Sequence, residues 1–318
     1  MRDFSLVDPQ LFAILEQFPE SDLNDGTLPA ARERADSIAT PSPEPSNSAA
    51  VRSEVWIQGP AGAPDVRLVI HTPPRDGALP VILHIHGGGM VLGSPDMNNT
   101  QNAALAVRHD CAVISVDYRL APETTAPGNV EDCYAALKWI NASAQTDQFD
   151  AANVILMGES AGGGLAASLA LLARDRGQFR IAAQFLKSPM LDDRTGSTTA
   201  SKGPYGLHVW TAAKNRFGWT ALLGTAPGGD SVSPYASPAR AADLMGLPPT
   251  YISVGALDLF FPESLEFARR LADAATPVEL HVYPGAFHGF EMAVSSDLAK
   301  HAALDLQIAL TRRLRDCV

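Results

Sequence analysis

A serine between glycines follows an apolar segment whose pattern indicates a β-strand. Ser160 lies in the sequence GESAG, residues 158–162, after the strand-like residues 154–157 and just before a helical pattern. A serine on such a sharp strand-to-helix turn requires very small residues two positions to either side, because the backbone brings both flanks together. The pattern indicates a nucleophilic serine. An ordinary glycine-rich turn is the alternative interpretation.

A second glycine-rich segment could stabilise the negative charge that such a nucleophile creates. The sequence HGGG, residues 86–89, follows the strand-like residues 81–85. Consecutive glycines allow several backbone N–H groups to turn toward one point, where they can hold an oxyanion. A flexible loop or a phosphate-binding loop would be the alternatives. The latter is disfavoured, because the lysine expected of a phosphate loop does not follow.

A nucleophilic serine needs a base, and the base needs an acid that orients it. His288 follows the strand-like residues 278–283, and Asp258 follows the strand-like residues 250–254. Taken alone, such a histidine is more often structural, and an aspartate after a strand more often caps a helix. Together they stand in the chain order Ser, Asp, His at the ends of predicted strands, which is typical of acyl transfer on an α/β sheet.

Apolar strand-like segments alternate with helical patterns along most of the chain. This alternation would position the GESAG and HGGG segments, Asp258 and His288. The expected strands are residues 51–57, 66–72, 81–85, 112–116, 154–157, 181–186, 250–254 and 278–283, and the expected helices are 7–18, 100–108, 130–142, 161–174, 264–275 and about 296–314. The first two strands, joined by a Gly- and Pro-rich turn, form an expected antiparallel hairpin. The remainder predicts an α/β fold with a mostly parallel sheet covered on both faces.

The rhythm of strands and helices breaks twice, which suggests segments outside the core. Residues 1–50 are interpreted as an N-terminal cap arm with a Pro- and Ser-rich linker at 40–48, and residues 191–225 as a cap insertion. The core would then consist of residues 51–190 and 226–318. A long irregular connection inside a compact domain is usually functional, for example as a lid.

Composition and charge exclude several classes of function. The 318 residues include 24 Lys and Arg against 35 Asp and Glu, a formal charge of −11 that opposes nucleic acid and anionic membranes as partners. Three cysteines without CxxC spacing, and a start without signal-peptide character, predict a cytoplasmic protein. The longest nearly apolar run, residues 165–173, is too short to span a membrane.

The motifs also occur in the order of a known family. HGGG at 86–89, DYRLAPE at 117–123, GESAGG at 158–163, Asp258 and HGF at 288–290 closely resemble the hormone-sensitive-lipase-like, bacterial family IV carboxylesterases of the α/β-hydrolase superfamily. The resemblance runs from about residue 51 to the C-terminus. It implies an α/β-hydrolase fold with an eight-stranded sheet and a helical cap, no metal or organic cofactor, and hydrolysis of mostly short-acyl esters. It also implies a possible homodimer through edge strand 278–283.

Two positions depart from the family pattern. Glu159 precedes the serine where the family usually has Asp or Thr, and it is interpreted as a conservative change on the buried side of the turn. After Asp258 the sequence reads LFFPE where the family reads P-L-x-D, so Glu263 is the alternative orienting acid. Tyr118, Arg119 and Glu123 are expected to form a buried polar or ionic cluster near the active-site loops.

The predicted function is therefore a serine carboxylesterase for short- to medium-acyl esters, acting through an acyl-enzyme on a small-molecule substrate. Ser160, His288 and Asp258 would be catalytic, and the N–H groups of Gly88, Gly89 and Ala161 would hold the oxyanion. Cap residues expected to line the pocket are Phe12, Leu15, Tyr205, Leu207, Trp210, Phe217 and Trp219. An amidase, a lactonase or a detoxifying hydrolase of bulky esters would use the same triad. A non-catalytic receptor on this fold is disfavoured, because the triad histidine is present.

Overall fold

Eight strands form one sheet within the described residues, which are 4–18, 22–39, 50–75, 77–143, 148–198 and 203–315 of a computed structural model. The expected linker at 40–48 lies outside them. The strands are β1 (Val51–Ile57), β2 (Val66–Thr72), β3 (Leu79–Ile85), β4 (Ala112–Val116), β5 (Phe149–Glu159), β6 (Ala183–Lys187), β7 (Thr250–Gly255) and β8 (Val278–Tyr283).

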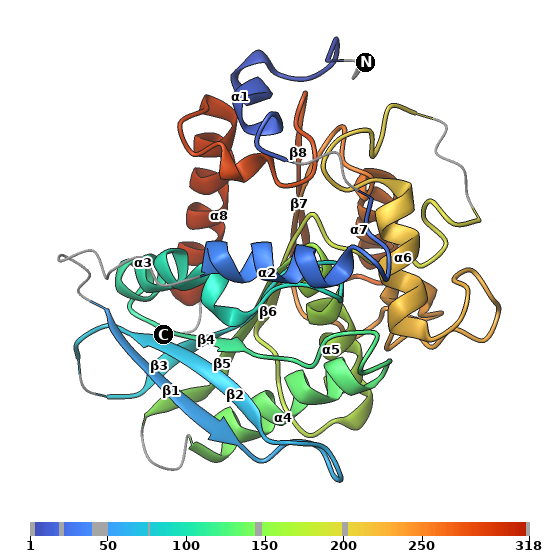
Figure 1. Cartoon of the computed structure of the whole chain (residues 1–318). Coiled ribbons are helices and arrows are strands. Elements are labelled where there is room, and N and C mark those ends of the chain that lie inside the picture. The colour runs from blue at the N-terminus through green and yellow to red at the C-terminus, as the bar shows by residue number, and fades with distance from the viewer. Residues whose placement is uncertain are drawn as a thin grey trace.

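The sheet has the order β1-β2-β4-β3-β5-β6-β7-β8 (Figure 1). The strand pairs β1–β2 and β2–β4 are antiparallel, and every other neighbouring pair is parallel. Because β4 and β7 are buried along their whole length, their sequences are continuously apolar or small instead of alternating. The predicted hairpin and the mostly parallel, eight-stranded sheet are confirmed.

Helices cover both faces of this sheet. They are α1 (Phe12–Leu15), α2 (Leu28–Ala39), α3 (Asn99–His109), α4 (Gly128–Ser143), α5 (Ala161–Arg176), α6 (Ala212–Leu223), α7 (Phe261–Asp273) and α8 (Asp297–Arg315). Alternate side chains of a strand point to opposite faces. From β3, Ile82 packs with residues of α3 and α8, whereas Leu83 and Ile85 belong to a larger cluster with α4, α5 and α7 (Figure 1).

Two helices were not predicted, and one was predicted too long. The arm expected to be helical over residues 7–18 contains only the 3₁₀ turn Pro9–Leu11 and α1. α2 has the polar sequence LPAARERADSIA, which lacks the apolar periodicity of a packed helix. α6 begins after the N-cap Thr211 and ends at Gly224, within the segment interpreted as a cap. The division into core and cap at residues 190 and 225 stays a prediction.

The segment DYRLAPE, residues 117–123, follows β4 and contacts α4, the HGGG segment and α2. Asp132 of α4 is fully buried, and it accepts hydrogen bonds from the backbone N–H and the guanidinium of Arg119. The buried Tyr118 donates to the carbonyl of His86 at 2.9 Å. Glu123 differs from the prediction, because its side chain is 62% exposed and pairs with Arg32 of α2. Tyr118 and Arg119 thus make separate polar contacts near the active-site loops, and Glu123 lies at the surface instead of in a buried cluster.

None of the helices in the described ranges is both long and apolar enough to cross a membrane. The cytoplasmic location stays a prediction.

Candidate active site

The structure brings three residues from distant parts of the chain into one hydrogen-bonded series. The Nε2 atom of His288 lies 3.0 Å from the Oγ of Ser160, and its Nδ1 lies 2.8 Å from Oδ2 of Asp258. Ser160 follows β5, Asp258 follows β7 and His288 follows β8, so all three stand at the carboxyl edge of the parallel strands. Asp258 is fully buried, and Ser160 and His288 are nearly so. The series has the geometry of a nucleophile, a base and an orienting acid.

The surroundings of His288 fix its orientation and its charge preference. Asp258 uses its second oxygen, Oδ1, to accept the backbone N–H of Phe260, which leaves Oδ2 for the imidazole. The ring of Phe260 stands edge-on to the imidazole at 5.2 Å between centroids. Burial disfavours the imidazolium, but the charge and hydrogen bond of Asp258 outweigh it and raise the pKa of His288 above 6.5. With Nδ1–H directed at Asp258, Nε2 is left to accept the serine proton.

The turn that carries Ser160 explains why its neighbours are glycines. Ser160 has φ 56° and ψ −120°, a backbone conformation that residues other than glycine rarely adopt. A Cβ on Gly158 would lie 2.3 Å from the carbonyl oxygen of Gly162, and a Cβ on Gly162 would lie 2.0 Å from that of Ile85. Any larger residue at either position would force the strand and the helix apart.

The glycine loop at 87–89 packs directly against this turn. A Cβ on Gly87 would lie 3.4 Å from the Cβ of Ser160. Gly88 and Gly89 have φ of 122° and 62°, and within the described ranges the N–H of neither glycine donates a hydrogen bond. Ala161 is the first residue of α5, where backbone N–H groups have no partner within the helix. Unused donors thus lie on both sides of the serine.

Known proteins resemble the chain over most of its length. A model of the α/β hydrolase fold family matches residues 82–292. This chain belongs to that family. Esterase LipI of Mycobacterium tuberculosis is 32% identical to the hydrolase over 286 residues, covering 89% of this chain and 88% of that protein.

Solved structures agree with this assignment. A bacterial heroin esterase is 38% identical to the hydrolase and superposes with a TM-score of 0.89 over 98% of this chain and 99% of its own. Esterase LipW from Mycobacterium marinum is 32% identical, with a TM-score of 0.86 over 98% of this chain and 96% of its own. The predicted relationship to the bacterial esterases of this fold is confirmed.

Of the residues predicted to line the pocket, Trp210 lies next to the glycine loop and His288. A Cβ on Gly89 would lie 2.1 Å from the Trp210 ring, so the six-membered ring of the indole packs against the glycine loop. Its ring centroid lies 6.3 Å from that of His288. The indole Nε1 donates to Asn215 of α6, which anchors the ring in the cap. Trp210 therefore limits the space beside the serine.

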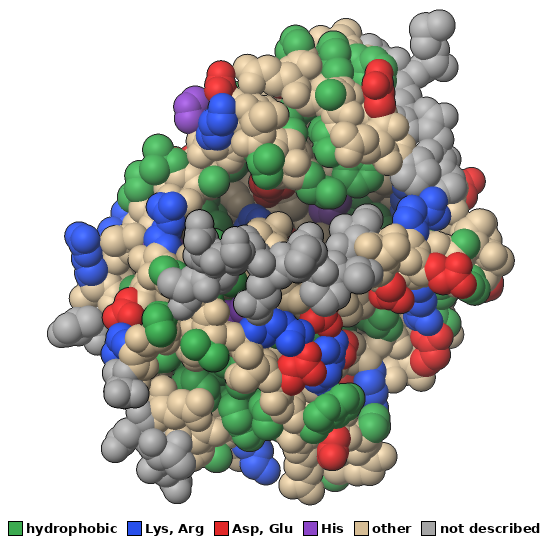
Figure 2. All heavy atoms as spheres, turned by 60° about the vertical axis from the view of Figure 1, so that its left-hand side comes forward, with side chains coloured by type: hydrophobic (Ala, Val, Ile, Leu, Met, Phe, Trp, Pro, Cys, Tyr) green, Lys and Arg blue, Asp and Glu red, His purple; other side chains and the backbone are tan. Residues whose placement is uncertain are grey.

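The other predicted pocket residues make contacts elsewhere. Leu207 is 56% exposed, Tyr205 packs on Phe261 at 5.5 Å, and Phe12 packs on Phe4 at 5.4 Å between ring centroids. The buried residues Leu15 and Trp219 belong to apolar clusters, and Phe217 packs against one of them. Their role as pocket residues stays a prediction. The face of the molecule that Figure 2 draws contains a hollow in which histidine and acidic side chains are visible.

No sequence motif indicated His208, which lies beside the loop that carries His288. His208 is buried, stacks on Phe4 at 5.7 Å and meets Phe287, the neighbour of His288, edge-on at 6.0 Å. The N-terminal arm thus reaches the loop of the base through two aromatic contacts.

Glu159 lies in a polar network behind the serine. Its carboxylate accepts from Asn98 at 2.8 Å and lies 3.1 Å from Nε2 of His84, whose other nitrogen meets Ser115. Burial opposes ionisation, but His84 and Lys187 outweigh it and lower the pKa of Glu159 to about 2. Glu159 is therefore charged at neutral pH and makes no hydrogen bond with the triad within the described residues.

His86 is separated from the triad by its own contacts. Burial lowers its pKa to about 4, so the ring is neutral, and Nδ1 lies 2.8 Å from the carbonyl of Gly87. The ring stacks on Tyr118 at 4.2 Å between centroids. These contacts support a structural role for His86 in the glycine loop.

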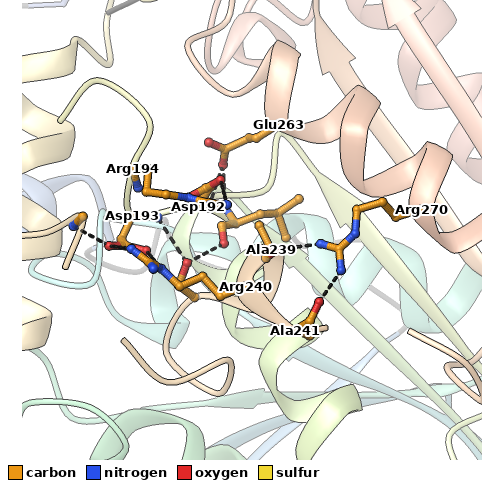
Figure 3. Close-up of polar contacts among 11 residues, drawn as sticks. Asp192, Asp193, Arg194, Ala239, Arg240, Ala241, Glu263 and Arg270 are labelled. Atoms are coloured by element: carbon orange, nitrogen blue, oxygen red, sulfur yellow. Dashed lines mark hydrogen bonds and ion pairs between the residues drawn. The ribbon is translucent and has the colours of Figure 1, made fainter. Parts of the chain in front are cut away.

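Glu263, the alternative orienting acid, faces the cap connection instead of His288. Figure 3 shows its Oε1 accepting the backbone N–H groups of Leu191 and Asp192. Burial raises the pKa of Glu263 well above its usual value. In the same view Arg240 pairs with Asp193, and Arg270 donates to the carbonyls of Ala239 and Ala241 (Figure 3). These contacts join residues 191–194, where the predicted cap insertion begins, and residues 239–241 to α7.

Arg32 of α2 attaches the N-terminal arm to the glycine loop. Its Nε donates to the carbonyl of Val91 at 2.9 Å, and Nη2 donates to that of Ala121 at 2.9 Å. Ala121 in turn donates its N–H to Met90, next to Gly89. The guanidinium also forms a bidentate pair with Glu123. No sequence motif marked Arg32, because these contacts join residues about sixty to ninety positions apart.

No three histidine, cysteine or acidic side chains are grouped as metal ligands in the part of the chain that the structure describes.

Replacing Arg32 by alanine is expected to lower kcat for 4-nitrophenyl acetate about tenfold while KM changes little, equivalent to about 1.4 kcal/mol in the barrier. The reason is that the loop carrying Gly88 and Gly89 loses two carbonyl anchors. Glu123→Gln is the matched control, because it keeps Arg32 and weakens only an exposed ion pair, which contributes little. Equal kcat losses in both variants would contradict the role of the carbonyl contacts.

Proposed function

We propose that this hydrolase is a serine carboxylesterase that cleaves short- to medium-acyl esters. The observation that carries the proposal is the series of hydrogen bonds from Ser160 through His288 to Asp258. Relatives named as esterases over nearly the whole chain support the same chemistry. The packing of Trp210 against the glycine loop supports a limited acyl length.

In the proposed first step, the Oγ of Ser160 bonds to the ester carbonyl carbon while Nε2 of His288 takes its proton. The carbonyl electron pair moves onto oxygen and returns when the bond to the alcohol breaks. His288 then protonates the leaving alkoxide, and the acyl group remains on Ser160. Asp258 holds the imidazole in the required tautomer and stabilises its charged form.

Stabilisation of the oxyanion would come from the backbone N–H groups of Gly88, Gly89 and Ala161. Each donor of this kind typically contributes about 3 kcal/mol to the transition state. Ala161 opens α5, whose positive dipole end lies at the same place. The glycine conformations support the assignment, because a side chain at Gly88 would lie 2.0 Å from the carbonyl oxygen of Leu92.

Water completes the cycle by the reverse sequence of events. His288 takes a proton from water as the water oxygen attacks the acyl carbon. The tetrahedral intermediate then collapses, the bond to Ser160 breaks, and His288 returns the proton to Oγ. The products are the carboxylic acid and the regenerated enzyme.

The first test is hydrolysis of a 4-nitrophenyl ester series from acetate to palmitate. Ser160→Ala is expected to lose at least about three orders of magnitude in kcat, as removal of a triad nucleophile does. Ser168→Ala is the matched control, since this serine is buried in α5, the helix that follows Ser160, and has no hydrogen-bond partner for its Oγ among the described residues.

The outcomes separate the alternatives. An inert wild type in which a fluorophosphonate still labels Ser160 would redirect the search to amides, lactones or bulky esters. A lack of both turnover and labelling would refute catalysis and favour the alternative hypothesis of a non-catalytic receptor.

The second test is the pH dependence of kcat/KM. The imidazole must be neutral to take the serine proton, so activity should fall as the pH drops through the pKa of His288, which lies above 6.5. In Asp258→Asn the loss of negative charge lowers this pKa. The acidic limb should therefore move to lower pH while kcat falls by about four orders of magnitude. A limb that stays in place would argue against Asp258 as the partner.

We also propose that the protein forms a homodimer through β8. Within the described residues this strand ends the sheet and pairs with β7 alone, and Val282 on it is 37% exposed. Sedimentation velocity should show a dimer for the wild type and a monomer for Val282→Lys, because an edge lysine opposes strand pairing. A wild type that sediments as a monomer at all concentrations would contradict the proposal.

A further inference from the structure

A second cavity lies at the opposite edge of the sheet from the triad. It has a volume of about 740 Å³, within the range of small-molecule sites. Its walls come from the start of β5, the residues just before β6 and β7, the last turns of α5 and the end of α8. These are the amino ends of the parallel strands, whereas the triad stands at their carboxyl ends.

The two sites are well separated. Asn153 lines the cavity and Ser160 follows the end of the same strand, β5. Seven residues of extended chain span about 23 Å. A ligand in this cavity therefore has no contact with the ester-binding side of the molecule.

The charge of the cavity is opposite to that of the protein. Arg174, Arg180 and Arg313 line it, and no acidic residue is among its lining residues in the described ranges. The chain as a whole carries a formal charge of −11. A concave site that gathers three guanidinium groups favours an anion, because the walls limit how far water can screen the charge.

Two of these arginines retain unused hydrogen-bond donors. Arg174 binds Asp175 through Nε and the carbonyls of Asp243 and Met245 through Nη1, which leaves its Nη2 hydrogens for other partners. Asp175 offsets part of the Arg174 charge but does not line the cavity. The exposed Arg180 makes no hydrogen bond or ion pair with any residue that the structure describes.

The rest of the wall is largely apolar. Apart from the arginines, Asn153 is the polar side chain among the lining residues in the described ranges, and Gly246 contributes backbone; the non-polar side chains are Ala152, Ala170, Phe179, Ile181, Ala182, Pro248 and Pro249. An inorganic anion would leave these surfaces without a partner, whereas the carbon chain of an organic anion would cover them.

We propose that this cavity binds an organic anion. Its carboxylate or phosphate head would contact the guanidinium groups of Arg174 and Arg180, and its short hydrocarbon body would lie on the apolar wall. Guanidinium groups bind both kinds of head through paired N–H···O bonds. Binding requires no catalytic step, so the proposal is independent of the proposed esterase activity.

Calorimetric titration of the full chain with hexyl phosphate, hexanoate and inorganic phosphate tests the proposal. Arg180→Ala is expected to weaken binding of the organic anions at least about tenfold, the effect of losing one charge-assisted contact. Arg180→Lys should have an intermediate effect, because it keeps the charge but loses the fork. Arg34→Ala is the matched control, since Arg34 is exposed on α2 and its guanidinium also has no partner in the described ranges.

Preferred binding of hexanoate or hexyl phosphate over inorganic phosphate, lost in Arg180→Ala and kept in Arg34→Ala, would support the proposal. Which organic anion binds more tightly identifies the head group. The proposal is overturned if neither organic anion binds, or if Arg180→Ala binds like the wild type. It is also overturned if inorganic phosphate binds as tightly as hexyl phosphate.

Discussion

The contact between the first turn of α5 and the end of β3 is the constraint on which the site depends. The backbones approach so closely that a Cβ on Gly162 would lie 2.0 Å from the carbonyl oxygen of Ile85. This approach places the serine turn against the loop that follows β3, although the two segments are about seventy residues apart. The glycines of both motifs serve one purpose, which is to let two pieces of backbone touch where side chains would keep them apart.

Two buried acids near the start of α7 show how environment separates their roles. Asp258 faces a histidine and a backbone N–H, so its carboxylate has a partner for each oxygen. Glu263 forms no ion pair among the described residues, and its Oε1 accepts two backbone N–H groups. Burial raises the pKa of Glu263, which suits an acid that fixes backbone rather than one that stabilises an imidazolium.

The strands of the sheet could be anticipated because local sequence determines them, and the triad residues could be anticipated because each follows one of these strands. The bounds of β1, β2, β4 and β8 agree with the apolar, β-branched segments that predicted them. α2 could not be anticipated in this way, since its attachment depends on one guanidinium binding carbonyls far along the chain. Glu123 was misplaced for the same reason, because its partner Arg32 lies in a segment whose fold the sequence pattern did not reveal.

Both segments that are predicted to form the cap contact the glycine loop, whose N–H groups we propose as oxyanion donors. Trp210 packs on Gly89, and Gly218 of α6 is so close that a Cβ there would lie 2.6 Å from the Gly89 carbonyl oxygen. From the other side, Arg32 holds the Val91 carbonyl two residues beyond Gly89. If these N–H groups hold the oxyanion as we propose, a change in the packing of either segment acts on the position of the donors. Such an effect falls on the transition state more than on substrate binding.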